Sequence, residues 1–203
     1  MQRGRSPEHG PGRQRVLDKA IHDQAVFRAH GIHLPKVSVN ISARRLRSKD
    51  LAEEIAGLQI PEGSMCFELL ESTFLDDTDE ALMWTLGAFR ERGIGIEIDD
   101  FGTGHASISG LLQIKPDGLK IDKSLVGPAL HDPSVKRLLS LIVEIGNALS
   151  VRVTAEGIET NDHVALARDM GCTTLQGFHF CKPLVTFDFI EAFATSEAYQ
   201  NSA

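Results

Sequence analysis

The stretch GLKIDKSLVGPALHDPSVKRLLSLIVEIGNALSVRVTAEGIET (118–160) decides the fold of this chain of 203 residues. Its two ends, 118–122 and 151–156, are short apolar runs of the kind that form buried strands. Between them, residues 134–149 carry one apolar stripe at helical spacing, formed by Val135, Leu138, Leu139, Ile142, Ile145 and Leu149. Because a strand, a helix and a second strand in this order build a right-handed crossover, the stretch predicts two parallel strands.

The same alternation continues on both sides of this stretch. Further strands are predicted at 37–41, 65–70, 95–99 and 174–178, and helices from Val16 onward and at 43–57, 79–92, 105–113, 161–170 and 187–198. Six strand–helix units in series indicate an α/β fold with a parallel sheet. The alternation alone is compatible with two arrangements of the sheet. One is a doubly wound sheet, which usually carries a GxGxxG turn that this chain lacks; the other is a (β/α) barrel, which needs eight strands.

Composition limits the class of protein. Hydrophobic residues make up 42% and charged residues 24%, as in an ordinary globular domain. The net charge of −7 argues against binding a nucleic acid polymer. Three cysteines without a CxxC pair, no signal peptide and no run long enough to span a membrane indicate a cytoplasmic protein. Residues 1–14 lack periodicity and are rich in Gly, Pro and Arg, so we expect a disordered tail before one domain at 15–203.

Polar side chains follow each predicted strand in turn. They are Asn40; Glu68 and Glu71; Asp99 and Asp100; Lys120 and Asp122; Glu156 and Glu159; and Gln176. In a β/α barrel the carboxyl ends of the strands form the rim on which active sites are built. Carboxylate and amide oxygens select Mg²⁺ or Mn²⁺ rather than zinc, and a crowded acidic cluster needs cations to balance it. Paired cations of this kind serve phosphate-ester cleavage, so the rim predicts that chemistry.

Six segments at these strand ends resemble the successive motifs of EAL domains, in the family's order. They are VNISARRL (39–46), FELLES (67–72), IDDFGTG (98–104), LKIDKSLV (119–126), TAEGIET (154–160) and LQGFHF (175–180). The resemblance covers roughly residues 16–190. It implies a TIM-like (β/α) barrel and a phosphodiesterase that hydrolyses cyclic-di-GMP to linear pGpG, with water as the nucleophile and Mg²⁺ or Mn²⁺ as cofactor.

The resemblance also implies a role for each rim residue. Asn40, Glu68 and Asp99 would bind one divalent cation, and Asp99, Asp100 and Glu156 the second. Lys120 would hold or activate the attacking water. Asp122, Glu159 and Gln176 would order that water, the lysine or the substrate, and Glu71 would anchor the loop DDFGTG. Expected partners are cyclic-di-GMP, a second copy of the chain and other EAL or GGDEF signalling proteins.

One departure from the family bears on activity. The Glu-Ala-Leu strand, whose glutamate is a metal ligand in the family, has no counterpart in this sequence. We therefore expect an incomplete barrel, with about six of eight strand–helix units and without the first two strands. Two alternatives to an enzyme remain open: a catalytically inactive EAL-like module that binds cyclic-di-GMP or a partner protein in signalling, and a gene fragment without function.

We predict that the chain of 203 residues is a poor phosphodiesterase that self-associates, because the strands at 37–41 and 174–178 would present unpaired edges. Adding an upstream segment with the Glu-Ala-Leu strand should restore solubility and turnover. Sedimentation and cyclic-di-GMP turnover of the two proteins, measured side by side, check this. A monomeric 203-residue protein with turnover equal to that of the extended one would contradict it.

Overall fold

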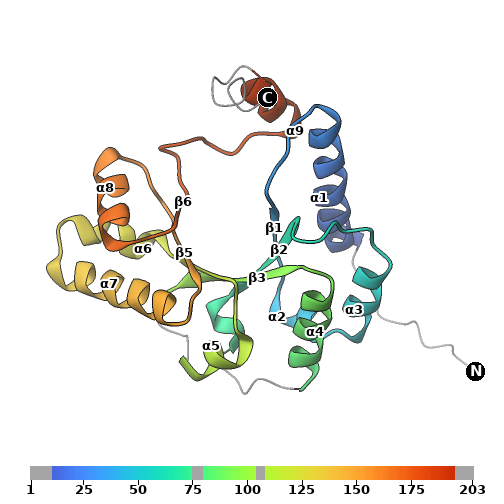
Figure 1. Ribbon diagram of the computed structural model, residues 1–203, viewed down its shortest axis with the longest axis horizontal. Helices are drawn as coiled ribbons and strands as arrows, with labels where there is room; N and C mark the ends of the chain where they lie inside the picture. The colour runs from blue at the N-terminus through green and yellow to red at the C-terminus, as the bar shows by residue number, and fades with distance from the viewer. Residues whose placement is uncertain (1–10, 75–79, 104–107, 195–203) are drawn as a thin grey trace, which may run out of the picture.

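The computed structural model describes residues 11–74, 80–103 and 108–194 and contains one curved parallel sheet. Its strands are β1 (Val37–Asn40), β2 (Met65–Leu70), β3 (Gly95–Phe101), β4 (Gly118–Ile121), β5 (Arg152–Ala155) and β6 (Thr174–Leu175). They lie side by side in chain order, β1 to β6. The prediction of an incomplete TIM-like barrel is confirmed, since the sheet forms a half-barrel with β1 and β6 at its two edges (Figure 1).

Helices follow the strands and lie around the outer side of the sheet (Figure 1). They are α1 (Pro11–Ala29), α2 (Ala43–Leu46), α3 (Lys49–Ala56), α4 (Glu80–Glu91), α5 (Ile108–Ile114), α6 (Lys123–Val126), α7 (Pro133–Ala148), α8 (Asn161–Met170) and α9 (Thr186–Ala194), with 3₁₀ turns η1 (Glu71–Phe74) and η2 (Pro128–Leu130). The last helix, α9, returns beside α1, where the rings of Phe27 and Phe189 meet edge-on at 5.1 Å. In the described residues, none of these helices has the length and apolar character needed to cross a bilayer.

The two faces of the sheet carry different chemistry. Along β3, Ile96 and Ile98 are fully buried against the helices, while Glu97 and Asp99 alternate with them and point into the half-barrel. Phe67 on β2 contacts Phe89 on α4 edge-on, with ring centroids 4.8 Å apart. The apolar core therefore lies between sheet and helices, and the concave face is left for polar side chains.

Helix α7 shows how the local sequence sets the packing. Asp132 caps its first turn, accepting a hydrogen bond from Ser134 N at 2.8 Å, and Pro133 follows at the position where a missing N–H has no cost. Farther along, Gly146 lies against Val153 of β5, so closely that any side chain at this position would collide with it. Helix 134–149 of the prediction is thus confirmed to within one residue at each end.

Several predicted boundaries were wrong. Helix α1 begins at Pro11, five residues before the predicted start at Val16, and residues 1–10 lie outside the described residues. Proline is well suited to start a helix, a signal that was overlooked. A disordered tail before the domain stays a prediction. The predicted helix 43–57 is two helices, because Ser48 is extended and starts α3 as its N-cap.

Strand β6 is shorter than predicted and ends at Leu175. Beyond it the Gln176 backbone still bonds the neighbouring segment: its N–H donates to Ala155 O at 2.9 Å, and its carbonyl oxygen accepts from Ile158 N at 3.0 Å. Strand β3 is longer than predicted and continues through Phe101. Of the predicted helices, residues 79, 105–107 and 195–198 lie outside the described residues.

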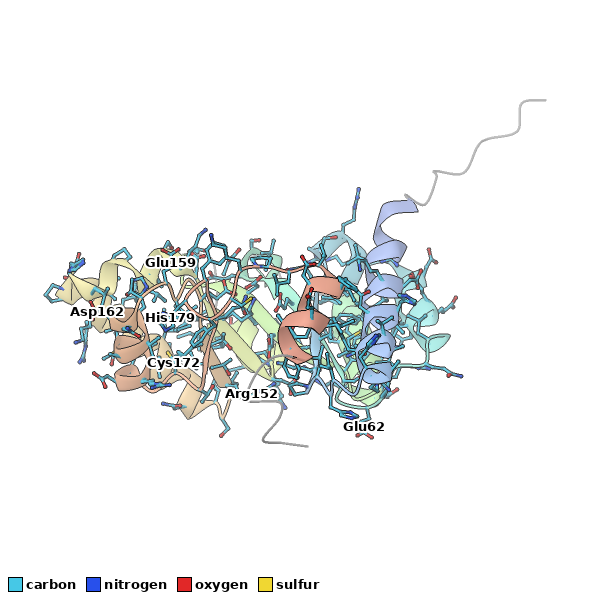
Figure 2. All side chains as sticks on the ribbon, turned by 90° about the horizontal axis from the view of Figure 1, so that it is seen from above. Glu62, Arg152, Glu159, Asp162, Cys172 and His179 are labelled. Carbon is cyan, nitrogen blue, oxygen red and sulfur yellow. The ribbon has the colours of Figure 1, made fainter. Side chains whose placement is uncertain are left out.

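A second charged cluster lies on the concave face, at the amino ends of the strands. Glu97 is 5% exposed; it forms an ion pair with Lys36, just before β1, and lies 3.5 Å from a guanidinium nitrogen of Arg152 on β5. Figure 2 shows Arg152 and Glu62 at this end of the molecule, and Glu159 at the opposite end. Through these two contacts Glu97 on β3 links the start of the edge strand β1 to β5 on the other side of the half-barrel.

We predict that Glu97→Gln lowers the free energy of unfolding by about 1–3 kcal/mol, because Lys36 would lose its ionic partner in a partly buried position. Urea unfolding followed by circular dichroism measures the effect. Glu144→Gln, on an exposed position of α7, is the matched control and should leave the midpoint unchanged. Equal midpoints for the two variants would show that Glu97 does not hold the half-barrel together.

Candidate active site

The side chain of Lys120 is surrounded by three carboxylates at the opposite end of the sheet. Its Nζ atom lies 2.6 Å from Glu156 Oε1, 3.1 Å from Glu68 Oε1 and 3.1 Å from Asp99 Oδ1. These residues come from β2, β3, β4 and the first position after β5. Because parallel strands place their carboxyl ends at one edge, residues far apart in the chain meet here.

The charges of this cluster interact strongly because the cluster is buried and solvent screens them little. The Lys120 side chain is only 5% exposed. Burial alone would lower the pKa of Lys120, but the hydrogen bond to Glu156 and the negative charges of the three carboxylates outweigh it, so the pKa lies above its ordinary value. Lys120 is therefore an ammonium that donates hydrogen bonds and does not accept a proton.

A bulge in β3 brings two neighbouring aspartates to the same site. In a regular strand Asp99 and Asp100 would point to opposite faces. The register between β3 and β4 shifts between Ile98 and Phe101, and Asp100 has a φ of 55°, in the left-handed region that is uncommon for residues other than glycine. Bulges of this kind redirect a side chain. As a result, oxygens from Asp99, Asp100 and Glu156 lie within 4.8 Å of one another.

The negative charge of this group is only partly balanced. Burial and the charges of Asp99 and Asp122 raise the pKa of Asp100 above its usual range. Burial also raises the pKa of Glu156, with the charges of Asp99 and Glu68 adding to it against the opposing effect of Lys120. Oxygen donors that crowd together and resist ionisation are the donor set that fits a hard divalent cation.

Asp122 holds the neighbouring turn in place. Its side chain accepts a hydrogen bond from Ser124 N at 2.9 Å and so caps α6. Burial tends to raise the pKa of Asp122, but this bond, the backbone bond from Lys123 and the charge of Lys123 lower it overall. Asp122 therefore remains ionised, and its charge contributes to the raised pKa of Asp100.

Glu71 binds the start of the loop that follows β3. Its Oε2 accepts hydrogen bonds from Gly102 N, Thr103 N and Thr103 Oγ1, each at 3.1 Å. Gly102 has a φ of 97°, and a side chain there would press on Leu125. These contacts place Glu71 where a loop anchor would act, and its effect on catalysis stays a prediction. Residues 104–107, the end of the predicted gating loop, lie outside the described residues.

The remaining predicted residues lie on the same rim but outside the ring around Lys120. Asn40 is the register partner of Glu68 and is exposed at the edge strand. Glu159 and Gln176 are also exposed, on segments joined through the backbone of Ile158. Among described residues, the Glu159 carboxylate is not one of those within 4.0 Å of Lys120 Nζ. The roles of Asn40, Glu159 and Gln176 therefore stay predictions.

Two polar residues were missed by the sequence analysis. Thr103 supplies the third hydrogen bond to Glu71, and its place in the IDDFGTG segment was the available signal. Glu97 forms the second charged cluster, and its spacing of two residues from Asp99 on one strand could have placed it on the concave face.

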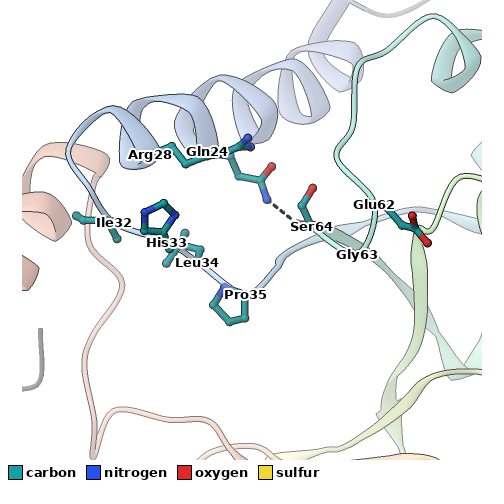
Figure 3. Close-up of a pocket in the computed structure, with 9 residues that line it drawn as sticks. All are labelled: Gln24, Arg28, Ile32, His33, Leu34, Pro35, Glu62, Gly63 and Ser64. Carbon is teal, nitrogen blue, oxygen red and sulfur yellow. Dashed lines mark hydrogen bonds between the residues drawn. The ribbon is translucent and has the colours of Figure 1, made fainter. Parts of the chain in front are cut away.

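Two cavities of about 300 Å³ lie away from the carboxylates. One, between α1 and the segment before β2, contains Gln24, whose Nε2 donates to Ser64 O at 2.5 Å (Figure 3). The other lies beside Asn40 at the edge strand β1 and is lined mainly by apolar side chains, among them Leu17, Val39 and Phe67. Neither cavity contains the acidic cluster.

We predict that Lys120→Met destabilises the metal-free protein by about 3 kcal/mol at pH 8, because it leaves buried carboxylates without a counter-charge. Without the ammonium these groups would have folded-state pKa values above their unfolded values near 4, so the lost stability should grow as pH rises above 4. Thermal unfolding of the variant and wild type at pH 5 and pH 8 measures it. Lys136→Met, on an exposed position of α7, is the control. A deficit that is equal or larger at pH 5 would contradict the charge balance described above.

Comparison with known proteins agrees with the fold and the rim. The EAL domain model matches residues 13–183. The Cyclic di-GMP phosphodiesterase PdeR of Escherichia coli (strain K12) is 33% identical over 182 residues, which are 88% of this chain and 27% of PdeR. The chain spans about a fifth to a quarter of the length of the first curated relatives it matches.

Solved structures give the same result. The EAL domain of Mycobacterium smegmatis DcpA has a TM-score of 0.83 and 30% identity, over 91% of this chain and 85% of that one. The PaMucR phosphodiesterase in complex with c-di-GMP has a TM-score of 0.80 and 29% identity, over 87% of this chain and 72% of that one. With the half-barrel, the acidic rim and a family match over most of its length, this chain belongs to the EAL domain family.

Proposed function

We propose that this domain hydrolyses cyclic-di-GMP to linear pGpG, by attack of water on one phosphodiester bond. The observation that carries the proposal is the group of Asp99, Asp100 and Glu156 oxygens next to the Lys120 ammonium. An anionic phosphodiester meets mainly carboxylates at this rim, so the site makes chemical sense only with divalent cations. The similarity to PdeR and to a phosphodiesterase complexed with c-di-GMP supports this substrate.

A complete site would hold two such cations, and this chain supplies all of the proposed ligands except the glutamate of the Glu-Ala-Leu strand. Asn40, Glu68 and Asp99 would hold one, and Asp99, Asp100 and Glu156 the other. All are oxygen donors, which favours Mg²⁺ or Mn²⁺ over softer metals. When bound, the cations would neutralise charge on the phosphate and lower the pKa of water at the site. The acidic group is partly exposed, so a cation can reach it from solvent.

Side chains of the protein would orient the water and the substrate. Lys120 is protonated, so it would orient the water and the phosphate by donating hydrogen bonds rather than by removing a proton. Glu156, whose oxygen lies 2.6 Å from Lys120 Nζ, would bind a cation and hold the lysine beside it. Asp122, Glu159 and Gln176 would fix the lysine, the water and the substrate, and Glu71 would keep the loop after β3 near the site.

The proposed reaction consumes only cyclic-di-GMP and water. Water adds its oxygen to phosphorus, one bridging P–O bond breaks, and the leaving sugar oxygen takes up a proton. One of the two phosphodiesters of the ring thereby becomes a terminal phosphate monoester, and the other remains intact in linear pGpG. We propose the cytoplasm as the site of this reaction, in keeping with the three free cysteines. A second copy or another EAL or GGDEF protein stays a proposed partner.

We predict that hydrolysis needs Mg²⁺ or Mn²⁺, that Ca²⁺ supports it poorly because of its looser geometry, and that excess chelator abolishes it. Chromatography of cyclic-di-GMP and pGpG after incubation with each cation measures this. Asp99→Asn is the matched variant, because it keeps the shape of the side chain and removes the charge proposed to serve both cations. Turnover that persists in chelator would contradict the proposal, and binding of cyclic-di-GMP without turnover under all conditions would replace it with a receptor function.

A further inference from the structure

The first turn of α8 is closed by a reciprocal pair of hydrogen bonds between side chains and backbone. Thr160, the N-cap residue, accepts from His163 N through Oγ1 at 3.2 Å. In return, Nδ1 of His163 lies 3.1 Å from Glu159 N, which donates to it. The usual capping box has glutamate or glutamine at this third helical position. Here a histidine fills the position, and its acceptor reaches one residue farther back, to Glu159.

The segment before α8 is held by a series of backbone bonds that ends at Glu159. Ile158 N donates to Gln176 O at 3.0 Å, and Ile158 O accepts from His179 N at 2.9 Å. Gly157 has a φ of 66° and packs so tightly on Lys123 that a side chain would not fit. The bond to His163 extends this support by one residue, so that the backbone of Glu159 is fixed on both sides.

The direction of this hydrogen bond defines which nitrogen of the His163 imidazole carries the proton. Since Glu159 N is a donor, Nδ1 of His163 must carry a lone pair, and the ring proton lies on Nε2. A side chain without an acceptor at this place would leave the Glu159 amide without its protein partner. It would also let the start of the helix, and the carboxylate of Glu159 with it, move relative to the rim.

We propose that His163 is a positioning residue, which fixes the backbone of Glu159 and thereby aims its carboxylate at the site around Lys120. The proposal rests on the proposed function as far as turnover is concerned, because it takes Glu159 as a member of that site. The fixing of the Glu159 backbone itself does not depend on the reaction, which allows the two to be tested apart.

Three variants separate positioning from helix capping. His163→Ala removes the acceptor for Glu159 N. His163→Asn restores an acceptor in the same place, because its Oδ1 atom, like Nδ1 of histidine, is one bond from Cγ. Thr160→Ala removes the other half of the box and leaves the bond between Glu159 and His163 in place. Should His163→Ala fail to fold, His163→Leu keeps the bulk of the side chain without an acceptor.

Each variant is measured in three ways: melting temperature, exchange of the Glu159 amide by nuclear magnetic resonance, and kcat and KM for cyclic-di-GMP with Mg²⁺. We expect similar drops in melting temperature for His163→Ala and Thr160→Ala. Only His163→Ala should speed exchange of the Glu159 amide, by about fivefold or more. It should also lower kcat by about 10- to 100-fold, with KM within about twofold of wild type. His163→Asn should recover both quantities.

Two results would overturn the proposal: an amide of Glu159 that remains protected in His163→Ala, or a Thr160→Ala variant that loses as much kcat as His163→Ala. If wild type does not hydrolyse cyclic-di-GMP, the proposed function fails, and amide exchange alone then decides whether His163 holds Glu159. Loss of protection in His163→Ala with recovery in His163→Asn supports that part, and unchanged protection rejects it.

Discussion

The ammonium of Lys120 is the interaction on which the site depends. Three carboxylates from three strand ends lie within 3.1 Å of its Nζ atom, in a place where solvent screens little of their charge. Without a positive charge at this point, the carboxyl ends of β2, β3 and β5 would repel one another. Lys120 balances only part of that charge, since the pKa values of Asp100 and Glu156 remain raised. The unbalanced remainder is what a divalent cation would neutralise.

The sheet accommodates this concentration of charge because its two faces differ: one packs apolar side chains against the helices, and the other carries the charged side chains. Apolar residues such as Ile96 and Ile98 face the helices and form the core, and their neighbours on the strand face the half-barrel. The concave face carries one charged cluster at each end, around Glu97 and around Lys120. A bulge then breaks the alternation at one point, so that both Asp99 and Asp100 reach the rim. The two aspartates thus lie where the chemistry is proposed to occur.

Sequence patterns predicted the parallel strands and the main members of the site, because periodicity and strand ends are local features. They left the strand order open between a doubly wound sheet and a barrel, and the barrel came from the resemblance to EAL domains. The strand 65–70 and the helix 161–170 were predicted with their observed boundaries. The bulge at Asp100 was not predicted, because a left-handed aspartate in a strand depends on its tertiary surroundings. The early end of β6 at Leu175 was not predicted either. The pairing of Glu97 with Lys36 joins residues 61 apart in sequence, and no local pattern carries it.

We propose that the rim holds two divalent cations, with Asp99 as a ligand of both. Anomalous diffraction from crystals grown with Mn²⁺ and cyclic-di-GMP tests this most directly. We expect two manganese peaks roughly 4 Å apart. One should lie against Glu68 and Asp99, and the other against Asp99, Asp100 and Glu156. Manganese found only elsewhere, or a rim without any peak at saturating Mn²⁺, would contradict it.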